Sequence, residues 1–352
     1  MGYFRENIEK MAGYEPGFQP KEADVVKLNT NENPYPPSPK AIETIRNINP
    51  DQLRRYPQSM ADTFREAVAE ILDVECENII CTNGGDELLN MTIRACCDEN
   101  RPLAYPTPSY TLYPVLAQIA NAPVIEIPFD SEFNLPAKLA SSGAALTIVC
   151  NPNAPSGTFT PKEELAQLAE ELKGLLLIDE AYVDFAEDNC LELVQKFDNV
   201  IILRSMSKGY SLAGLRFGFG IANEKIIKGL EKVKDSYNAD AVSIAAATAA
   251  IQDQQYFKNN VQKIKIERKF LTEKLTELGF EVPASQANFV FAKPAKIRAI
   301  DVYGKLKDRN IYVRYWAYPD INDKLRITVG TGEQNEKLIG ALKEIVTADF
   351  TD

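Results

Sequence analysis

The 352-residue chain contains no histidine and only one tryptophan. The absence of histidine excludes a Ser-His-Asp triad, a Cys-His dyad and a histidine metal site, and we expect no metal in the functional site. Any general base therefore has to be lysine, aspartate, glutamate, tyrosine or cysteine.

Long apolar runs and an excess of basic charge are also missing. No apolar run approaches the roughly 20 residues of a membrane span, and residues 1–17 lack the apolar core of a secretory signal. Acidic residues outnumber basic ones, 50 to 39, which gives a net charge of −11. That balance argues against a nucleic-acid partner. None of the six cysteines forms a CxxC pair, so we expect a reduced, cytoplasmic protein without a membrane partner.

Short apolar runs alternate with helical periodicity up to about residue 240. The run ALTIVC at residues 145–150 is apolar almost throughout, which is typical of a strand buried on both faces. Alternation of such strands with helices predicts a largely parallel α/β sheet. Strands are expected at residues 78–81, 102–105, 124–127, 145–150, 175–178, 200–203 and 217–221.

The pattern changes after about residue 240. An alanine-rich helix at 241–252 is followed by a long charged helix at about 255–278. Further on, short strands near 287–292, 311–315 and 325–329 mix with helices near 300–308 and 333–345. This mixture predicts a second, smaller α+β domain.

Several segments at predicted strand ends carry reactive side chains. RSMSKG at 204–209, followed by AGLRFG at 213–218, offers hydroxyls, a lysine and an arginine, which suit a phosphate ester beside a reactive amine. A surface lysine in a serine-rich loop is the alternative. Asp179 ends an apolar run, where a carboxylate is costly unless it is paired, although it would also serve as a helix cap.

Two glycine- or proline-rich turns follow other predicted strands. Gly84 and Gly85 precede a helix start, where backbone N–H groups can hold an anion. NPNAPSG at 151–157 predicts a rigid turn at the edge of the sheet. Taken alone, each turn is also compatible with an ordinary loop.

In their order and spacing these segments resemble the histidinol-phosphate aminotransferases, which are pyridoxal-phosphate enzymes of fold type I related to aspartate aminotransferase. The resemblance extends over nearly the whole chain. It includes Asn31-Glu32-Asn33-Pro34, Arg55-Tyr56-Pro57, YPTPSY at 105–110, DEAY at 179–182 and LRITVGT at 325–331.

The resemblance implies a large domain with a mostly parallel, mixed seven-stranded sheet flanked by helices, and a smaller α+β domain. We expect an N-terminal arm at residues 1–35, the large cofactor-binding domain at 36–245 and the small domain at 246–352. The arm would contribute to the small domain and to a dimer contact. The resemblance implies a homodimer with its active site at the subunit interface.

The resemblance assigns three catalytic residues. Lys208 would form a Schiff base with pyridoxal 5'-phosphate and, once released, move the substrate proton. Asp179 would pair with the pyridine nitrogen, and Tyr182 would hydrogen-bond to the phenolic oxygen of the cofactor. Tyr110 resembles the aromatic residue that stacks on the ring, with a plain core tyrosine as the alternative.

The resemblance also implies how the cofactor phosphate is held. The residues around it would be Gly85, Asp86, Ser205, Ser207 and Arg216. Tyr56 resembles a tyrosine that reaches the phosphate bound by the neighbouring subunit. The chain departs from the family where an asparagine contacts the phenolic oxygen, because Ala154 stands there. Either Asn153 or Tyr182 alone makes that contact, or the loop is shifted.

For the substrate, Arg326 resembles an arginine that binds carboxylate groups, and a bidentate pair explains why arginine is used. Arg314 resembles a second basic contact, to a substrate phosphate, with an exposed strand arginine as the alternative. Tyr14 resembles a tyrosine that closes over the substrate. Trp316 either lines an aromatic pocket or takes part in domain packing.

The resemblance implies transamination of L-histidinol phosphate with 2-oxoglutarate, which gives imidazole-acetol phosphate and L-glutamate in histidine biosynthesis, with ping-pong kinetics. An aromatic-amino-acid aminotransferase is the nearest alternative, and a phosphothreonine-type decarboxylase is another. Outside catalysis, the alternatives are a pyridoxal-phosphate-binding module or an unrelated α/β binding protein.

Overall fold

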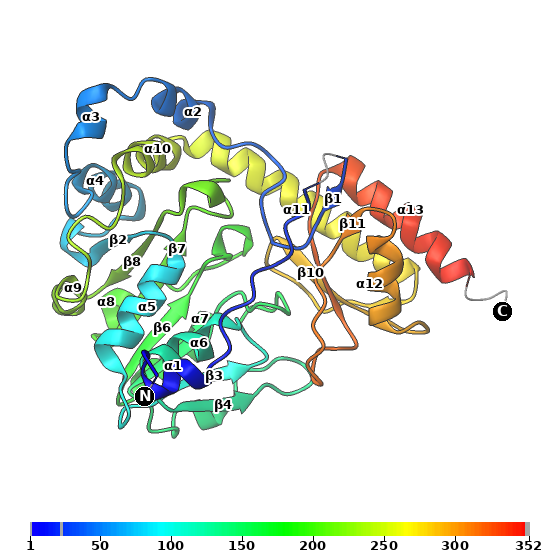
Figure 1. Cartoon of the computed structure of the whole chain (residues 1–352), viewed down its shortest axis with the longest axis horizontal. Coiled ribbons are helices and arrows are strands. Elements are labelled where there is room, and N and C mark those ends of the chain that lie inside the picture. Colours follow the sequence, from blue (N-terminus) through cyan, green and yellow to red (C-terminus); the bar gives the residue numbers. More distant parts are fainter. Residues whose placement is uncertain (1, 22–23, 349–352) are drawn as a thin grey trace.

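The computed structural model describes residues 2–21 and 24–348 (Figure 1). The large domain is built on a seven-stranded sheet with the order β2-β8-β7-β6-β5-β3-β4. Strand β8 runs antiparallel to its neighbours β2 and β7, and the remaining pairs are parallel. The mixed, mostly parallel sheet expected from the sequence is confirmed. Its strands are β2 Ile79–Thr82, β3 Leu103–Thr107, β4 Val124–Pro128, β5 Leu146–Cys150, β6 Leu175–Asp179, β7 Val200–Ser205 and β8 Gly218–Ala222.

Helices cover both faces of this sheet. Alternate residues of a strand point to opposite faces, so Leu176 and Ile178 of β6 join one apolar cluster and Leu177 joins the other. Both clusters are buried, which explains why the strands are apolar at successive positions. The first face is covered by α4 Asp62–Leu72, α7 Lys162–Glu171, α8 Leu193–Lys196 and α10 Ala241–Gln252. The second is covered by α5 Gly85–Cys96, α6 Leu112–Ile119 and α9 Glu224–Glu231.

The small domain contains an antiparallel sheet with the order β12-β10-β9 and a parallel pair of strands, β1 and β11. Its strands are β1 Val26–Lys27, β9 Phe280–Glu281, β10 Phe289–Pro294, β11 Ile311–Tyr312 and β12 Leu325–Thr328. Its helices are α11 Gln254–Glu277, α12 Ala299–Lys307 and α13 Gly332–Ala348. The expected strand 311–315 is shorter than predicted, because only Arg314 continues it, through an isolated bridge to Arg326.

Helix α11 leads from the large domain into the small one (Figure 1). The preceding helix, α10, packs against α4 and against α2 Pro39–Arg46, which both belong to the large domain. The boundary expected at 245/246 therefore falls inside α10, and the chain turns between the two helices at Asp253.

The N-terminal segment crosses the molecule twice. It starts with α1 Glu6–Lys10, which packs against α6, and then reaches the small domain, where β1 pairs with β11. It returns to the large domain through α2 and α3 Pro50–Arg54 (Figure 1). Over the described residues, we find no helix with both the length and the apolarity to span a membrane.

Candidate active site

A cavity of about 340 Å3 lies between the two domains. It is bordered by the carboxyl ends of β5, β6 and β7 and by the start of α5, the edge of an α/β sheet at which ligands bind. The N-terminal segment adds residues between Tyr14 and Glu32, and the small domain adds Arg314, Trp316 and Arg326. Three parts of the chain that are far apart in the sequence thus line one site.

The cavity brings together nearly all residues expected from the sequence. Those in its lining are Tyr14, Gly85, Asp86, Tyr110, Asp179, Tyr182, Ser205, Ser207, Lys208, Arg216, Arg314 and Arg326. Asn153 and Tyr56 are the expected residues that do not line it. Trp316 lines it as well, in agreement with the pocket alternative for this residue.

Asn153 is buried and its amide is used elsewhere. Its Nδ2 donates to the carbonyl oxygen of Pro108 at 3.1 Å and to the Ser156 hydroxyl at 2.9 Å. Ala154 lines the cavity in its place. Of the two residues expected to make the contact to the phenolic oxygen, Tyr182 lines the cavity and Asn153 does not.

Tyr56 lies at the surface with an exposed fraction of 80%. Its ring stacks on that of Tyr237, with the centroids 4.5 Å apart. The structure therefore does not bring Tyr56 to the cavity of its own chain.

Lys208 follows β7 and points into the cavity. Its Nζ donates to the carbonyl oxygen of Thr30 at 3.3 Å, and the Asn33 side-chain amide donates to the Lys208 carbonyl oxygen at 2.9 Å. Burial, assisted by the positive charge of Arg326, lowers the pKa of Lys208 to about 8 from 10.5. A lysine in this state is still mostly protonated at pH 7, but it supplies far more neutral, nucleophilic amine than an ordinary lysine does.

The pKa of Lys208 predicts how the free protein reacts with an aldehyde. Because only the neutral amine attacks, borohydride-trapped labelling of Lys208 should rise with pH around a midpoint of about 8. Peptide mass spectrometry after trapping would measure this. Arg326→Gln should move the midpoint to higher pH, since it removes a charge that disfavours protonation of Lys208. A midpoint near 10.5, the ordinary lysine value, would contradict the prediction.

Asp179 is buried at the end of β6. Its Oδ2 accepts a hydrogen bond from the hydroxyl of Tyr113 at 2.7 Å, and its Oδ1 accepts one from the Ala181 N–H at 3.1 Å. Burial raises the pKa of Asp179 to about 6, and these two hydrogen bonds oppose the rise. Asp179 therefore remains largely ionised at neutral pH and can face a protonated ring nitrogen.

Two tyrosines form an aromatic and polar wall. The Tyr182 hydroxyl accepts a hydrogen bond from Asn31 Nδ2 at 3.0 Å, and burial raises the pKa of Tyr182 to about 12. The Tyr110 ring meets those of Tyr14 and Tyr113 edge-on, at centroid distances of 6.1 and 5.6 Å. Lining the cavity favours the ligand-contact interpretation of Tyr110 over a plain core role.

The start of α5 forms an anion cradle. Gly84, at the N-cap, has a φ of 81°, and no side chain caps the helix. A Cβ on Gly84 would lie 2.8 Å from Nη2 of Arg216, so only glycine lets this guanidinium approach the helix end. Arg216 Nη2 also donates to Asp86 Oδ2 at 3.1 Å. Open helix N–H groups beside a guanidinium and two serine hydroxyls fit a phosphate group.

Two arginines share the far wall with Trp316. The guanidinium carbons of Arg314 and Arg326 each lie 5.1 Å from the Trp316 ring centroid. Arg326 Nη2 donates to the carbonyl oxygen of Asn29 at 3.0 Å, but its buried Nε has no hydrogen-bond partner. Two positive guanidiniums therefore lie close together, and one buried N–H group has no acceptor. Both observations indicate a binding site for an anionic ligand.

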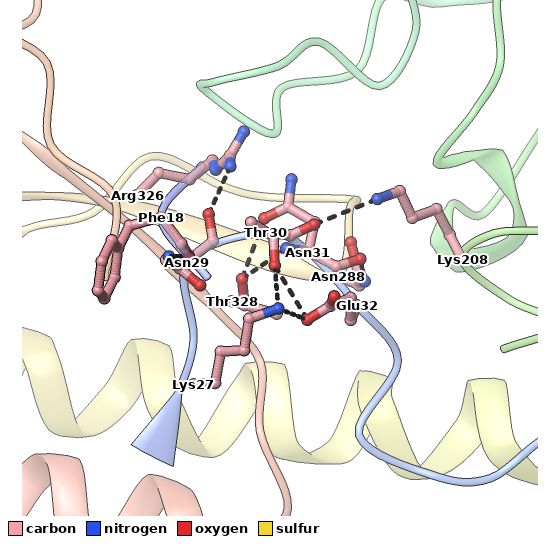
Figure 2. A network of polar contacts seen from close by, with 10 residues as sticks. All are labelled: Phe18, Lys27, Asn29, Thr30, Asn31, Glu32, Lys208, Asn288, Arg326 and Thr328. Atoms are coloured by element: carbon pink, nitrogen blue, oxygen red, sulfur yellow. Dashed lines mark hydrogen bonds and ion pairs between the residues drawn. The ribbon is translucent and has the colours of Figure 1, made fainter. Parts of the chain in front are cut away.

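The sequence analysis gave no role to residues 29–33 or to Tyr113. Figure 2 shows the Asn29 and Thr30 carbonyl oxygens directed at Arg326 and Lys208. The signal for residues 29–33 was the segment Asn31-Glu32-Asn33-Pro34, which is part of the resemblance to the family. For Tyr113 it was the spacing of three residues from Tyr110, which places two residues on one side of a helical turn.

Comparison with known proteins agrees with this geometry. The profile of the family described as aminotransferase class I and II matches residues 23–342. Histidinol-phosphate aminotransferase 1 of Trichormus variabilis is 49% identical to the chain over 346 residues, which cover 98% of this chain and 99% of the relative. The chain belongs to the class I and II aminotransferases. Within that class it is a member of the histidinol-phosphate aminotransferase family.

Solved structures confirm the fold. Histidinol-phosphate aminotransferase from Sinorhizobium meliloti, in complex with pyridoxal-5'-phosphate, has a TM-score of 0.90 at 24% identity, with 99% of this chain and 98% of that chain covered. L-threonine-O-3-phosphate decarboxylase from Porphyromonas gingivalis has a TM-score of 0.79 at 21% identity, over 92% of this chain and 100% of that chain. The fold is thus shared by transaminases and a decarboxylase and does not by itself separate them.

Proposed function

We propose that this protein transfers the amino group of L-histidinol phosphate to 2-oxoglutarate, with pyridoxal 5'-phosphate as cofactor. The products are imidazole-acetol phosphate and L-glutamate. The observation that carries the proposal is the pair of guanidiniums of Arg314 and Arg326 beside Trp316, in the same cavity as Lys208. A phosphate ester and a dicarboxylate are both dianions, so one pair of arginines suits both substrates in turn.

The residues present fit the cofactor. When bound, pyridoxal 5'-phosphate supplies the aldehyde that takes the amino group and the ring that accepts electrons from the substrate carbon. Asp179 would face the ring nitrogen and Tyr182 the phenolic oxygen, with Tyr110 against the ring. The phosphate would lie in the cradle formed by Gly85, Asp86, Ser205, Ser207 and Arg216.

Each of the other steps is assigned to a side chain of the protein. Lys208 would supply the amine that holds the aldehyde carbon and, once the amine of the substrate has replaced it there, the group that takes the proton from the substrate carbon and delivers it again. Ionised Asp179 would keep the ring nitrogen protonated. Arg326 exchanges the Asn29 carbonyl for the acidic group of the substrate, which also satisfies its free Nε. Tyr14 lies over Tyr110 and would shield the cavity from water.

We further propose that the active unit is a homodimer. Tyr56 is exposed and stacked on Tyr237, so its hydroxyl is available to a second subunit, where it would reach the cofactor phosphate.

The proposed parts of the chain are an arm at 1–35, a large domain at 36–245 and a small domain at 246–352. All six cysteines are free, which supports a cytoplasmic location.

The function is tested by titrating cofactor-loaded protein with L-histidinol phosphate in the absence of any keto acid. We expect the visible absorption of the bound cofactor to be replaced by the near-ultraviolet absorption of pyridoxamine phosphate. Addition of 2-oxoglutarate should restore the first spectrum and release one glutamate per site. Restoration by the keto acid separates transamination from decarboxylation.

Phenylalanine and tyrosine serve as the comparison donors in the same titration. A response to these two at lower concentrations than to histidinol phosphate would replace the proposal by an aromatic-amino-acid aminotransferase. Arg314→Gln sharpens the comparison, because it should weaken the response to histidinol phosphate more than the response to phenylalanine, which carries no phosphate.

A further inference from the structure

Asn31 lies buried at the junction of the two domains. It has an exposed fraction of 1% and a left-handed backbone with a φ of 55°, a conformation that asparagine tolerates better than most residues. Its carbonyl oxygen accepts a hydrogen bond from Asn288 Nδ2 at 3.0 Å. Figure 2 shows Asn31 between Thr328 and Asn288, which both belong to the small domain.

The hydrogen bonds between Asn31 and Thr328 have a defined direction. The Asn31 backbone N–H donates to Thr328 Oγ1 at 3.0 Å, and the Thr328 hydroxyl donates its one proton to Asn31 Oδ1 at 3.1 Å. The Asn31 side-chain oxygen is thereby committed to Thr328. Rotating the amide by half a turn would remove the acceptor of the Thr328 proton.

The orientation of the Asn31 amide also determines the direction of its hydrogen bond to Tyr182. With Asn31 Oδ1 held by Thr328, the NH2 group of Asn31 faces Tyr182 and donates to its hydroxyl oxygen at 3.0 Å. A phenol that accepts from Asn31 keeps its own proton for another partner. Tyr182 lines the cavity, so that proton is available to a ligand there.

We propose that Asn31, oriented by Thr328, is a positioning residue that commits the Tyr182 hydroxyl to donate a hydrogen bond into the cavity. In the complex with pyridoxal 5'-phosphate, the acceptor is the phenolic oxygen of the cofactor. This inference rests on the proposed function. With Ala154 where the family has an asparagine, a Tyr182 hydroxyl of fixed polarity would keep a hydrogen-bond donor for that oxygen.

The chain contains its own optical probe for the test. Trp316 is the one tryptophan and it lines the cavity, so its fluorescence in the cofactor-free protein reports ligand binding without any catalytic turnover. We would measure dissociation constants for pyridoxal 5'-phosphate and for 3-deoxypyridoxal 5'-phosphate, which lacks the phenolic oxygen. The change in the ratio of the two constants between wild type and a variant reports the hydrogen bond that the protein makes to that oxygen.

The variants are Thr328→Val, which removes the hydroxyl with little change of shape, and Thr328→Ser, which retains it. Wild type should prefer the complete cofactor by about tenfold, the value of one ordinary hydrogen bond. Thr328→Val should reduce this preference by about threefold or more, and Thr328→Ser should restore it. Thr92→Val is the matched control, because Thr92 is a buried threonine in α5 whose hydroxyl donates to the Leu88 carbonyl oxygen of its own helix, and it should leave the preference unchanged.

Asn31→Asp provides a second variant if Thr328→Val does not fold. A carboxylate at this position can only accept, so Tyr182 would donate to it and the preference for the phenolic oxygen should disappear. The inference is overturned if folded Thr328→Val or Asn31→Asp keeps the wild-type preference, or if wild type shows none. If wild type does not bind pyridoxal 5'-phosphate at all, the proposed function itself fails.

Discussion

Lys208→Gln should abolish transamination while it stabilises the cofactor-free protein. Turnover is expected to fall by at least about 10⁴-fold, because the side chain loses both its nucleophilic amine and its proton-transfer group. Glutamine has a similar length but carries no charge. Assays with saturating cofactor and donor would measure the loss, and thermal unfolding of the cofactor-free protein would measure the stability.

The stability effect has a defined pH dependence. Because the pKa of Lys208 is about 8 in the folded chain against 10.5 for an ordinary lysine, the unfolded state binds more protons between these values. The buried charge thus destabilises the fold most below pH 8, and the penalty disappears as the pH rises to 10.5. Lys208→Gln should raise the free energy of unfolding at neutral pH by about 1 to 3 kcal/mol.

Lys208→Arg is the matched control for both effects. Arginine stays charged at every relevant pH, so this variant should lose turnover without the gain in stability. Turnover within about tenfold of wild type in Lys208→Gln would contradict the assignment of Lys208, since acid–base groups alone contribute more than that.

Asp179→Asn is expected to reduce turnover by about 10³-fold while the affinity for pyridoxal 5'-phosphate changes by less than about tenfold. Asparagine preserves the shape and can still accept the Tyr113 hydrogen bond, but it lacks the negative charge that holds a proton on the ring nitrogen. Single-turnover kinetics and cofactor titration would separate the two effects. An equal loss of affinity and turnover would instead indicate a role in binding.

Tyr113→Phe provides the companion measurement. The Tyr113 hydroxyl lowers the pKa of Asp179, which burial places at about 6, so its removal should raise that pKa further. Since protonated Asp179 is inactive in this scheme, the acid limb of the pH–rate profile should shift to higher pH. Activity at pH values well above the limb should be affected much less. An unchanged acid limb would argue that another group titrates there.

The central strands of the large domain were predictable from the sequence because they are buried on both faces. In β6 the successive residues Leu176, Leu177 and Ile178 enter opposite clusters, which leaves no polar position to interrupt the apolar run. The short helices α2 and α3 were not predicted. Helix α2 begins at Pro39, at the end of the proline-rich residues 34–39, whose composition favours loop structure, and α3 is only five residues long.

Within the site, residues close to the strand ends were the predictable part. Asp179 ends the apolar run of β6, and Lys208 lies three residues after the end of β7, so the sheet determines their place. The contact of Asn31 with Thr328 joins residues 297 positions apart, and local pattern contains no information about such a pair. Likewise, spacing alone could not decide between Asn153, Tyr182 and a shifted loop, because the geometry of the turn determines whether the Asn153 side chain faces the cavity.

The path of the N-terminal segment has a consequence for the synthesis of the protein. Strand β1 pairs with β11, and Asn31 forms hydrogen bonds with Thr328. The N-terminal residues are synthesised first, but their partners are translated almost 300 residues later. Domains usually fold in the order of their synthesis, but here the active site is assembled only after the large sheet is complete. Nascent chains shorter than about 330 residues should therefore contain the large sheet and the residues around the proposed cofactor position, but lack the Thr328 contact that orients Asn31.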